Sequence, residues 1–344
     1  MQIGTVCAVA LVLSTAAAQG AASAPPRGWN SYDSYTWHVN ETQFLSNCKV
    51  MAERLLPFGY NTCVVDYLWY QSEGGEWSLD DECRPVPNAQ RWPSTKGASF
   101  KPIADQVHAM GLKFGIHIML GTSTWAVEQN CTIAGTDSTI AAIAGEQCSW
   151  KGDSLQVNVS LAAGRAFYDR LYEQYAEWDV DFIKNDCIFG DNFVEDNIVA
   201  QAASIAKLKR EVVYSLSPGT HAEDAAGISA IVERGVAISS HVNMYRITGD
   251  DWDHWADLYP SHFDTAAAFA AKGLIAAKGL GGRPSFPDLD MLPLGWIAQP
   301  GDTHHAPTHN TSLTPSEQRT QMTLWAMARR CVDFIYRYTL CESC

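Results

Sequence analysis

Apolar runs of strand length alternate with longer helix-like stretches through most of this 344-residue chain, and no other feature restricts its fold as much. Five runs are apolar enough for buried strands: residues 60–69, 112–119, 180–188, 211–216 and 241–247. Six further stretches have helical character, several beginning at Asn, Ser, Thr or Asp caps: residues 41–56, 100–110, 161–178, 194–209, 252–271 and 315–327. Repeated strand–helix units predict a parallel sheet, and this many in one domain favour a (β/α)8 barrel over an open doubly wound sheet.

The charge balance restricts the partners that such a domain can bind. The sequence holds 24 basic and 38 acidic side chains, which leaves a formal net charge of −14 at pH 7. Nucleic acid, a polyanion, is therefore disfavoured as a partner, and a neutral or cationic ligand fits better. No G-x-G-x-x-G motif follows the first strand-like run, so a dinucleotide-binding fold has little support. The 12 Trp and 13 Tyr side chains suit either the core or the wall of a sugar-binding cleft.

Residues 1–24 have the features of a secretory signal peptide. An apolar run at residues 6–13 is followed by small residues, and Ala22, Ser23 and Ala24 form an A-x-A cleavage motif. Neither this run nor a later one is long enough to span a bilayer, so we expect no membrane association. N-glycosylation sequons at Asn40, Asn130, Asn158 and Asn310 agree with a secreted or lumenal location, such as the cell wall or an acidic vacuole-like or lysosome-like compartment.

The cysteines favour disulfides over a metal site. Outside the signal peptide there are nine: Cys48, Cys63, Cys83, Cys131, Cys148, Cys187, Cys331, Cys341 and Cys344. Only the last two have a C-x-x-C spacing, and no second pair completes a zinc site. In an oxidising compartment we expect disulfides, with one cysteine left over because the count is odd. The spacing leaves the connectivity open.

Polar residues gather where the predicted strands end. Within the first three runs, the predicted strands end at Asp66, at His117, and at Lys184 and Asp186 of "DFIKNDCIFG". Further candidates follow later strands: Arg246, Asp250, Asp288 and Asp290. A single Asp at a strand end is more often a cap or a structural ion pair, but several at one end of a barrel indicate a site, because barrel enzymes carry their chemistry there.

Seven motifs, in order, resemble those of glycoside hydrolase family 27, the melibiase or α-galactosidase family, close to its β-L-arabinopyranosidase-like branch. The resemblance covers roughly residues 27–328, and its motifs are "PPRGWNSYDSY", "YNTCVVDYLWY", "GLKFGIHIM", "DFIKNDCIFG", "NMYRITGDDWDHW", "FPDLDMLPLG" and "EQRTQMTLWAMA". The resemblance implies a (β/α)8 catalytic barrel followed by a small antiparallel β-domain. It also implies hydrolysis of terminal α-galactosides with retention of configuration, without a metal or another cofactor. The oligomeric state stays open.

The same resemblance implies roles for individual residues. Asp186 matches the nucleophile and Asp250 the general acid/base. The other matched positions are sugar ligands or pocket walls: Trp29, Tyr32, Asp66, His117, Lys184, Ser217, Arg246, Asp288 and Asp290. The residue types also indicate this chemistry, since a retaining glycosidase needs two carboxyl groups about 5–5.5 Å apart, one ionised and one protonated.

Departures from the family pattern leave the substrate open. Tyr67 follows Asp66 where a second Asp is usual, Ser217 stands in place of a Glu, and His117 stands in place of a Tyr. Three substrate classes therefore remain: α-galactosides, β-L-arabinopyranosides, which lack the hydroxymethyl group of galactose, and α-N-acetylgalactosaminides. A non-catalytic, lectin-like product is the alternative from another class.

The tail departs furthest from the family. After Ala328 the chain reads "RRCVDFIYRYTLCESC", which has no family counterpart. We therefore predict a barrel over residues 25–328, an atypical tail at 329–344 and no C-terminal β-domain. "VDFIYRY" is the candidate for an atypical last strand, since it is rich in β-branched and aromatic residues.

Overall fold

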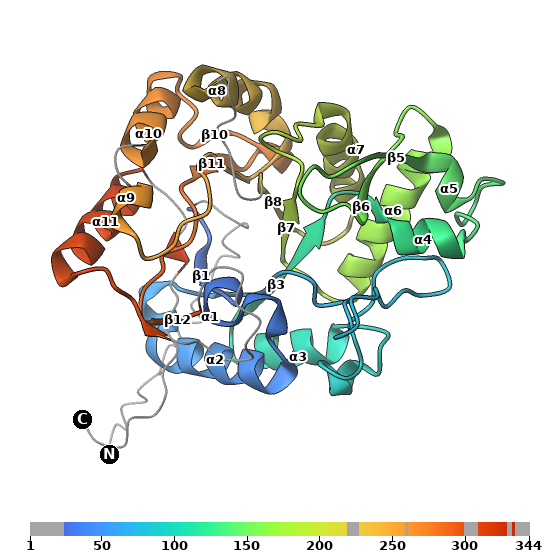
Figure 1. Ribbon diagram of the computed structural model, residues 1–344, viewed down its shortest axis with the longest axis horizontal. Coiled ribbons are helices and arrows are strands. Elements are labelled where there is room, and N and C mark those ends of the chain that lie inside the picture. Colours follow the sequence, from blue (N-terminus) through green and yellow to red (C-terminus); the bar gives the residue numbers. More distant parts are fainter. Residues whose placement is uncertain (1–23, 219–226, 259–260, 299–308, 329–331, 334–344) are drawn as a thin grey trace, which may run out of the picture.

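The computed structural model describes residues 24–218, 227–258, 261–298, 309–328 and 332–333. Strands surround a central axis, and helices lie on the outside (Figure 1). Eight strands form one parallel sheet: β1 (Arg27–Asn30), β2 (Thr62–Val65), β3 (Lys113–Met119), β7 (Phe182–Asp186), β8 (Val213–Leu216), β9 (Met244–Arg246), β11 (Pro284–Asp288) and β14 (Val332–Asp333). Their spatial order is β11-β9-β8-β7-β3-β2-β1-β14, with a short antiparallel β10 (Ala277–Lys278) beside β11. This is the predicted (β/α)8 TIM barrel.

The helices fill the connections between these strands. They are α2 (Glu41–Arg54), α3 (Lys101–Ala109), α6 (Ala162–Glu177), α7 (Glu195–Ala206), α8 (Gly227–Ile238), α10 (Ser261–Ala271) and α11 (Pro315–Met327). α2 and α11 begin at capping boxes, in which Asn40 and Thr314 accept from the backbone N–H three residues later. The single helix expected over 252–271 is wrong. It divides into α9 (Trp255–Leu258) and α10, with Pro260 in the sequence between them, because proline interrupts a helix.

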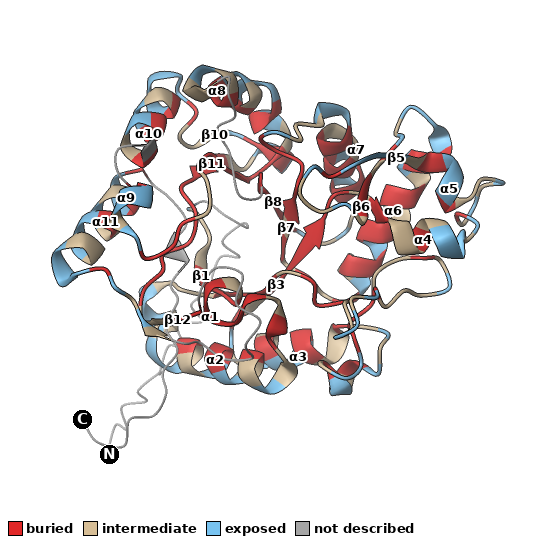
Figure 2. Ribbon diagram, in the orientation of Figure 1, coloured by how far each residue is buried: buried red, intermediate tan, exposed pale blue. Residues whose placement is uncertain are grey.

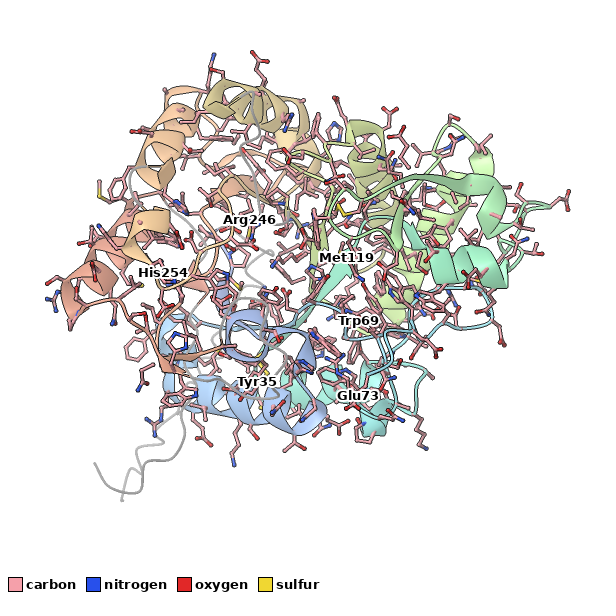
Figure 3. All side chains as sticks on the ribbon, viewed as in Figure 1. Tyr35, Trp69, Glu73, Met119, Arg246 and His254 are labelled. Atoms are coloured by element: carbon pink, nitrogen blue, oxygen red, sulfur yellow. A yellow bond between two sulfur atoms is a disulfide. The ribbon has the colours of Figure 1, made fainter. Side chains whose placement is uncertain are left out.

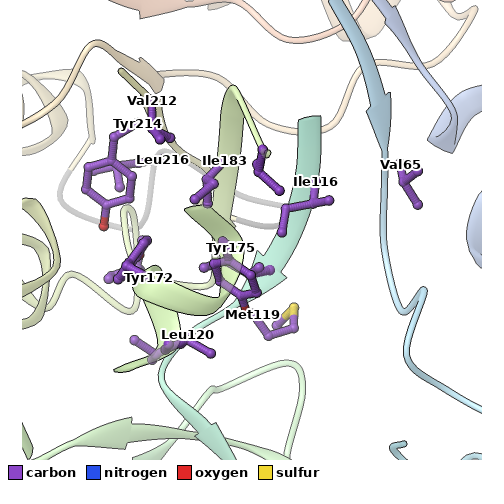
Figure 4. Close-up of a cluster of buried hydrophobic side chains, with 14 of the residues drawn as sticks. Val65, Ile116, Met119, Leu120, Tyr172, Tyr175, Ile183, Val212, Tyr214 and Leu216 are labelled. Carbon is purple, nitrogen blue, oxygen red and sulfur yellow. The ribbon is translucent and has the colours of Figure 1, made fainter. Parts of the chain in front are cut away.

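The alternation of side chains along β7 explains why this core strand ends in charge. Phe182 faces the barrel interior, where it forms a small apolar cluster with residues of β2, β8 and β9. Ile183 faces outward into the main core, in the same cluster of buried side chains as Tyr172 of α6 (Figure 4). Successive side chains point to opposite faces, so Lys184 and Asp186 face inward again, at the end of the strand where the interior opens. Figure 2 shows the strands as the buried layer beneath partly exposed helices.

A second, smaller sheet lies in the connection between β3 and α6, and the sequence patterns did not predict it. β4 (Thr122–Ser123) and β5 (Ala144–Gln147) both pair antiparallel with β6 (Ser154–Val157). α4 (Thr124–Gln129) and α5 (Ile140–Ile143) complete this excursion, which extends to one side of the barrel (Figure 1). β4, β5 and β6 have two to four residues each and, unlike the equally short β2 and β8, lie outside the long apolar runs, so no sequence pattern marked them.

Three disulfides join the described cysteines: Cys48–Cys63, Cys83–Cys131 and Cys148–Cys187. The expected use of cysteine is therefore confirmed, and it fits an oxidising compartment. The remaining cysteines and the signal peptide lie outside the described residues. No helix in the described part of the chain is long and apolar enough to cross a membrane.

The last strand of the barrel comes from the atypical tail. Val332 and Asp333 pair in parallel with Arg27 and Gly28 of β1, in the position expected for strand eight. Among the described residues, no pairing joins β14 to β11. Residues 334–344, which include the rest of the "VDFIYRY" candidate, lie outside the described residues.

Candidate active site

A pocket of about 200 Å³ opens at the carboxyl ends of the barrel strands. Its walls are Tyr32, Asp33, Asp66, Tyr67, Trp150, Lys184, Asp186, Arg246, Asp250, Asp251, Trp252, Asp290 and Met291. Six of these side chains are carboxyls and only two are cations, so the pocket is strongly acidic. Figure 3 shows Arg246 near the centre of the ring of strands, among many other side chains.

Asp186 is held as a carboxylate at the end of β7. His117, one strand away on β3, places Nε2 3.0 Å from Asp186 Oδ2, and the backbone N–H of Cys187 donates to Oδ1 at 2.8 Å. Burial alone would raise the pKa of Asp186, but the hydrogen bond with His117 and the charges of His117, Lys184 and Arg246 hold that pKa well below its usual range. Asp186 therefore carries an ionised carboxylate into the pocket.

Lys184 and Asp66 form an ion pair beside Asp186. The Lys184 ammonium lies 3.1 Å from Asp66 Oδ2, and the Asn30 amide donates to the same oxygen at 2.6 Å. The Ser31 hydroxyl accepts from the backbone N–H of Asp66 at 2.9 Å. Burial opposes the ionisation of both groups, but the attraction to Lys184 lowers the pKa of Asp66, and Asp66 and Asp186 raise that of Lys184. Both groups thus stay charged and fixed in place.

Asp250 lies in the loop after β9 and has a different environment. Arg246 contacts it from the strand end, with Nη2 2.7 Å from Asp250 Oδ1, while Nη1 lies 3.1 Å from Asp290 Oδ2. Burial raises the pKa of Asp250 to about 6, because the opposing effect of Arg246 is partly offset by the nearby charges of Asp290 and Asp186. The Asp250 side chain keeps 28% of its surface exposed, so a ligand in the pocket can reach it.

Seven of the eleven predicted site residues line this pocket: Tyr32, Asp66, Lys184, Asp186, Arg246, Asp250 and Asp290. The other four lie behind its walls. Trp29 packs outward against Phe44 of α2, and His117 is buried behind Asp186. Ser217 is buried next to β7, where its backbone N–H donates to Asn185. Asp288 accepts from the backbone N–H of Asp290 at 3.1 Å and so shapes the loop after β11.

The remaining wall residues were not assigned a binding role from the sequence. Asp33, Asp251 and Met291 each adjoin a predicted residue, and Trp252 lies two positions after Asp250, so the motifs that contain them were their only signal. Trp150 had no signal, because it lies in the connection between β5 and β6 of the small sheet. Its ring centroid lies 6.3 Å from that of Tyr67.

Comparison with solved structures places this barrel in a family. The β-L-arabinopyranosidase of glycoside hydrolase family 27 from Geobacillus stearothermophilus is 36% identical to this chain, with a TM-score of 0.80 over 92% of this chain and 72% of that one. The chain belongs to glycoside hydrolase family 27. A putative α-N-acetylgalactosaminidase from Bacillus halodurans is 31% identical, with a TM-score of 0.74 over 91% of this chain and 71% of that one.

Curated family members are more distant in sequence. The α-galactosidase of Cyamopsis tetragonoloba is 23% identical over 91% of this chain. The chain spans 59% of the length of that relative, and it is similarly short against the rice and Arabidopsis thaliana α-galactosidases, at 57% and 60%. No family model matches the chain.

One of the expected departures from the family 27 pattern lies in the pocket wall. Tyr67 stands where the family usually has an Asp, with its ring edge-on to Tyr32 at 5.9 Å and to His117 at 5.5 Å. Burial raises the pKa of Tyr67, and the surrounding acidic groups raise it further, so its hydroxyl stays neutral. An aromatic ring thus occupies wall space that a charged ligand for sugar hydroxyls usually takes.

Proposed function

We propose that this protein is a retaining exo-glycosidase that hydrolyses terminal α-D-galactosides by double displacement. Asp186 is the nucleophile and Asp250 the general acid/base. The observation that carries the proposal is the contrast between these two carboxyls of one pocket: the pKa of Asp186 lies well below its usual range, whereas that of Asp250 is raised to about 6. Retaining catalysis needs one ionised and one protonated carboxyl, and environments that separate two pKa values in this way assign the two roles.

The reaction proceeds in two displacements at the anomeric carbon. In the first, an Asp186 oxygen bonds to the anomeric carbon as the bond to the leaving oxygen breaks, and Asp250 gives its proton to that oxygen. In the second, a water molecule gives a proton to the Asp250 carboxylate, the water oxygen bonds to the anomeric carbon, and the bond to Asp186 breaks. Two inversions leave the configuration unchanged.

The charged walls bind and orient the sugar. Lys184, Asp66, Arg246 and Asp290 present fixed charges to the pocket, and charge-assisted hydrogen bonds to hydroxyl groups are the stronger kind. Tyr32 and Trp252, with ring centroids 6.2 Å apart and planes at 55°, supply two apolar faces. The family's curated α-galactosidases, such as that of Cyamopsis tetragonoloba, support this substrate class.

Substitution of the two carboxyls tests these roles. Asp186→Asn and Asp250→Asn should each abolish turnover of nitrophenyl α-D-galactoside. Azide should rescue Asp186→Gly and yield the glycosyl azide of inverted configuration, because only one displacement then occurs. NMR of the first-formed product of the unmodified enzyme should show the α-anomer. Near-full activity of Asp186→Asn would contradict the assignment, and binding without turnover by the unmodified protein would favour the lectin-like alternative.

A β-L-arabinopyranosidase is the second candidate, and Tyr67 favours it. The neutral Tyr67 hydroxyl cannot accept the charge-assisted bonds that an Asp offers to the outer hydroxyls of galactose. The Geobacillus stearothermophilus arabinopyranosidase, whose variant was crystallised with arabinose, is also the relative at 36% identity. α-N-acetylgalactosaminidase has less support, since Ser217, the small residue that favoured it, does not line the pocket.

Paired kinetics decide between the two. kcat/KM should be measured for nitrophenyl α-D-galactoside and nitrophenyl β-L-arabinopyranoside on one preparation. With Tyr67 in the wall, the galactoside should hold an advantage of less than about 100-fold, which corresponds to about 2.7 kcal/mol of transition-state binding. A larger advantage would show that Tyr67 does not weaken recognition of the hydroxymethyl group.

We also infer that the protein is secreted or enters a lumenal compartment, with residues 1–24 as its signal peptide and residues 25–328 as the catalytic barrel. The three disulfides support this route. N-terminal sequencing of the secreted protein would reveal the cleavage site.

A further inference from the structure

A buried histidine outside the pocket contacts the residue next to the proposed acid. His262 lies in α10, and its Nε2 is 2.7 Å from Oδ1 of Asp251, which directly follows Asp250. The two side chains are 2% and 0% exposed. The imidazole and the carboxyl are therefore in close polar contact, shielded from solvent. None of the patterns in the sequence pointed to His262.

Both members of this pair are fixed by further contacts. The His262 ring stacks on Trp325 of α11, with ring centroids 5.7 Å apart and planes at 20°. The Trp325 indole N–H donates to the backbone carbonyl of Asp290 at 2.8 Å, and the Asp290 carboxylate accepts from the backbone N–H of Asp251 at 2.8 Å. A closed chain of contacts therefore joins α10, α11, the loop after β11 and the loop after β9.

The same chain of contacts reaches the acid itself. The Asp290 oxygen that accepts from Asp251 also lies 3.1 Å from Arg246, and Arg246 contacts Asp250 at 2.7 Å. Asp251 faces Asp290, Arg246, Asp33, Asp250 and His262. Burial and the charges of Asp290, Asp33 and Asp250 raise the pKa of Asp251 well above its usual range, against the attraction of Arg246. Arg246 already contacts the carboxyls of Asp250 and Asp290, whereas the His262 ring lies at contact distance from the Asp251 carboxyl. His262 therefore holds Asp251 in place.

We propose that His262 is a positioning residue for general acid catalysis: by fixing Asp251, it holds the loop that presents the Asp250 carboxyl to the leaving oxygen. This inference rests on the proposed function. His262 lies outside the pocket and touches neither substrate nor reacting atoms. Its effect on the acid is therefore transmitted through Asp251. The role makes a chemical prediction that ordinary structural support does not, since a misplaced acid harms only those substrates whose leaving group needs a proton.

Leaving groups of different basicity reveal this role. A dinitrophenolate departs without protonation, whereas a methoxide does not. His262→Phe keeps a ring to stack on Trp325 but removes the nitrogen that contacts Asp251. We expect kcat/KM for the methyl glycoside to fall roughly 10- to 100-fold, and for the dinitrophenyl glycoside less than about threefold, because acid catalysis contributes about 10²- to 10⁴-fold.

Further variants separate positioning from folding. His262→Gln returns an N–H donor near the Nε2 position and should restore most of the methyl glycoside activity. Asp251→Asn/His262→Phe removes the carboxyl that His262→Phe leaves buried without a partner, and it should keep the same selective loss on a more stable chain. His108→Phe is the matched control: His108 pairs with Asp181 at the same 2.7 Å, but Asp181 precedes β7, at the end of the barrel away from Asp186. It should leave the ratio of the two kcat/KM values unchanged.

The outcomes are distinct. A selective loss on the methyl glycoside, with rescue by His262→Gln, supports the positioning role. Equal losses on both substrates, or no loss on either, would overturn it and leave the proposed function intact. Absence of turnover of both glycosides by the unmodified enzyme would overturn the proposed function, and this role with it.

Discussion

At the scale of single residues, the two proposed catalytic carboxyls differ in pKa because of their neighbours and not because of burial. Burial raises the pKa of both Asp186 and Asp250. Asp186 has a hydrogen bond with His117 and nearby cations, which outweigh that cost, whereas the attraction of Asp250 to Arg246 is offset by other carboxylates. One barrel mouth can thus hold an ionised and a protonated carboxyl at the same pH.

The pH dependence of activity follows from Asp250. An acid with a pKa of about 6 is mostly protonated below that pH, so kcat/KM should fall tenfold per unit as pH rises well above 6. The pKa of Asp186 is depressed, so loss of its charge should affect only the far acid side. A pH profile with methyl α-D-galactoside, whose leaving group needs the proton, measures both limbs. A basic limb above pH 8 would contradict the protonation state given to Asp250.

His117 gives a second prediction at this scale. His117→Phe removes the hydrogen bond to Asp186, so the pKa of Asp186 should rise and the acid limb should move to higher pH. A hydrogen bond to a charged group contributes about 1.5–3 kcal/mol, which corresponds to about 1–2 pH units. His117→Tyr keeps a donor and serves as the matched control. An unmoved acid limb in His117→Phe would show that His117 does not stabilise the carboxylate.

Whether a pocket residue could be predicted from the sequence depends on the direction of its side chain. The position of Asp186 was predictable because it ends a recognisable strand, and the alternation of side chains along that strand points it inward. Trp29 shares a motif with Tyr32 but lies on β1 with its ring turned outward to Phe44, so proximity in sequence did not place it in the pocket. His262 enters only through the packing of α10 on α11, which no local pattern encodes.

At the scale of elements, long periodic segments were predictable and short ones were not. The expected helix at residues 161–178 corresponds to α6, whose buried tyrosines recur on one face. The sequence patterns did not predict α8, because its 12 residues include two glycines and several β-branched side chains, which favour helix weakly. The small β4–β6–β5 sheet also escaped notice, yet its Trp150 completes the pocket wall.

The Cys148–Cys187 disulfide fastens that small sheet to the end of β7. Cys187 directly follows Asp186, and Cys148 lies two residues before Trp150. Replacing both cysteines with alanine should destabilise the protein by about 4 kcal/mol, from the loop entropy of a 39-residue separation. It should also raise KM, because Trp150 and Asp186 lose their shared anchor. Urea unfolding and steady-state kinetics measure the two effects, and the Cys83–Cys131 double variant controls for general loss of stability.

At the scale of the whole molecule, the barrel gathers distant residues by ordering its strands. Tyr32 follows β1, Asp186 ends β7 and Met291 follows β11, yet all three line one pocket. The strand order was implied by the strand–helix repeat, because sequential parallel units wind in one direction. The identity of the last strand was harder to predict, since no motif in the tail resembled the family and β14 is defined by its pairing with β1.

The contribution of β14 can be tested on the intact chain. β14 covers one edge of β1, and β1 leads directly to the pocket residues Tyr32 and Asp33. A chain that ends at Ala328 should expose the β1 edge, melt at lower temperature, aggregate more readily and lose activity. Proline at both positions 332 and 333 keeps the full length but removes the backbone donors, and should cost about 1 kcal/mol for each ladder hydrogen bond lost. Thermal melts, light scattering and turnover compare the three chains. If the shortened chain matched the full one in all three measurements, β14 would not close the barrel in solution; if only the proline variant matched, length rather than pairing would matter.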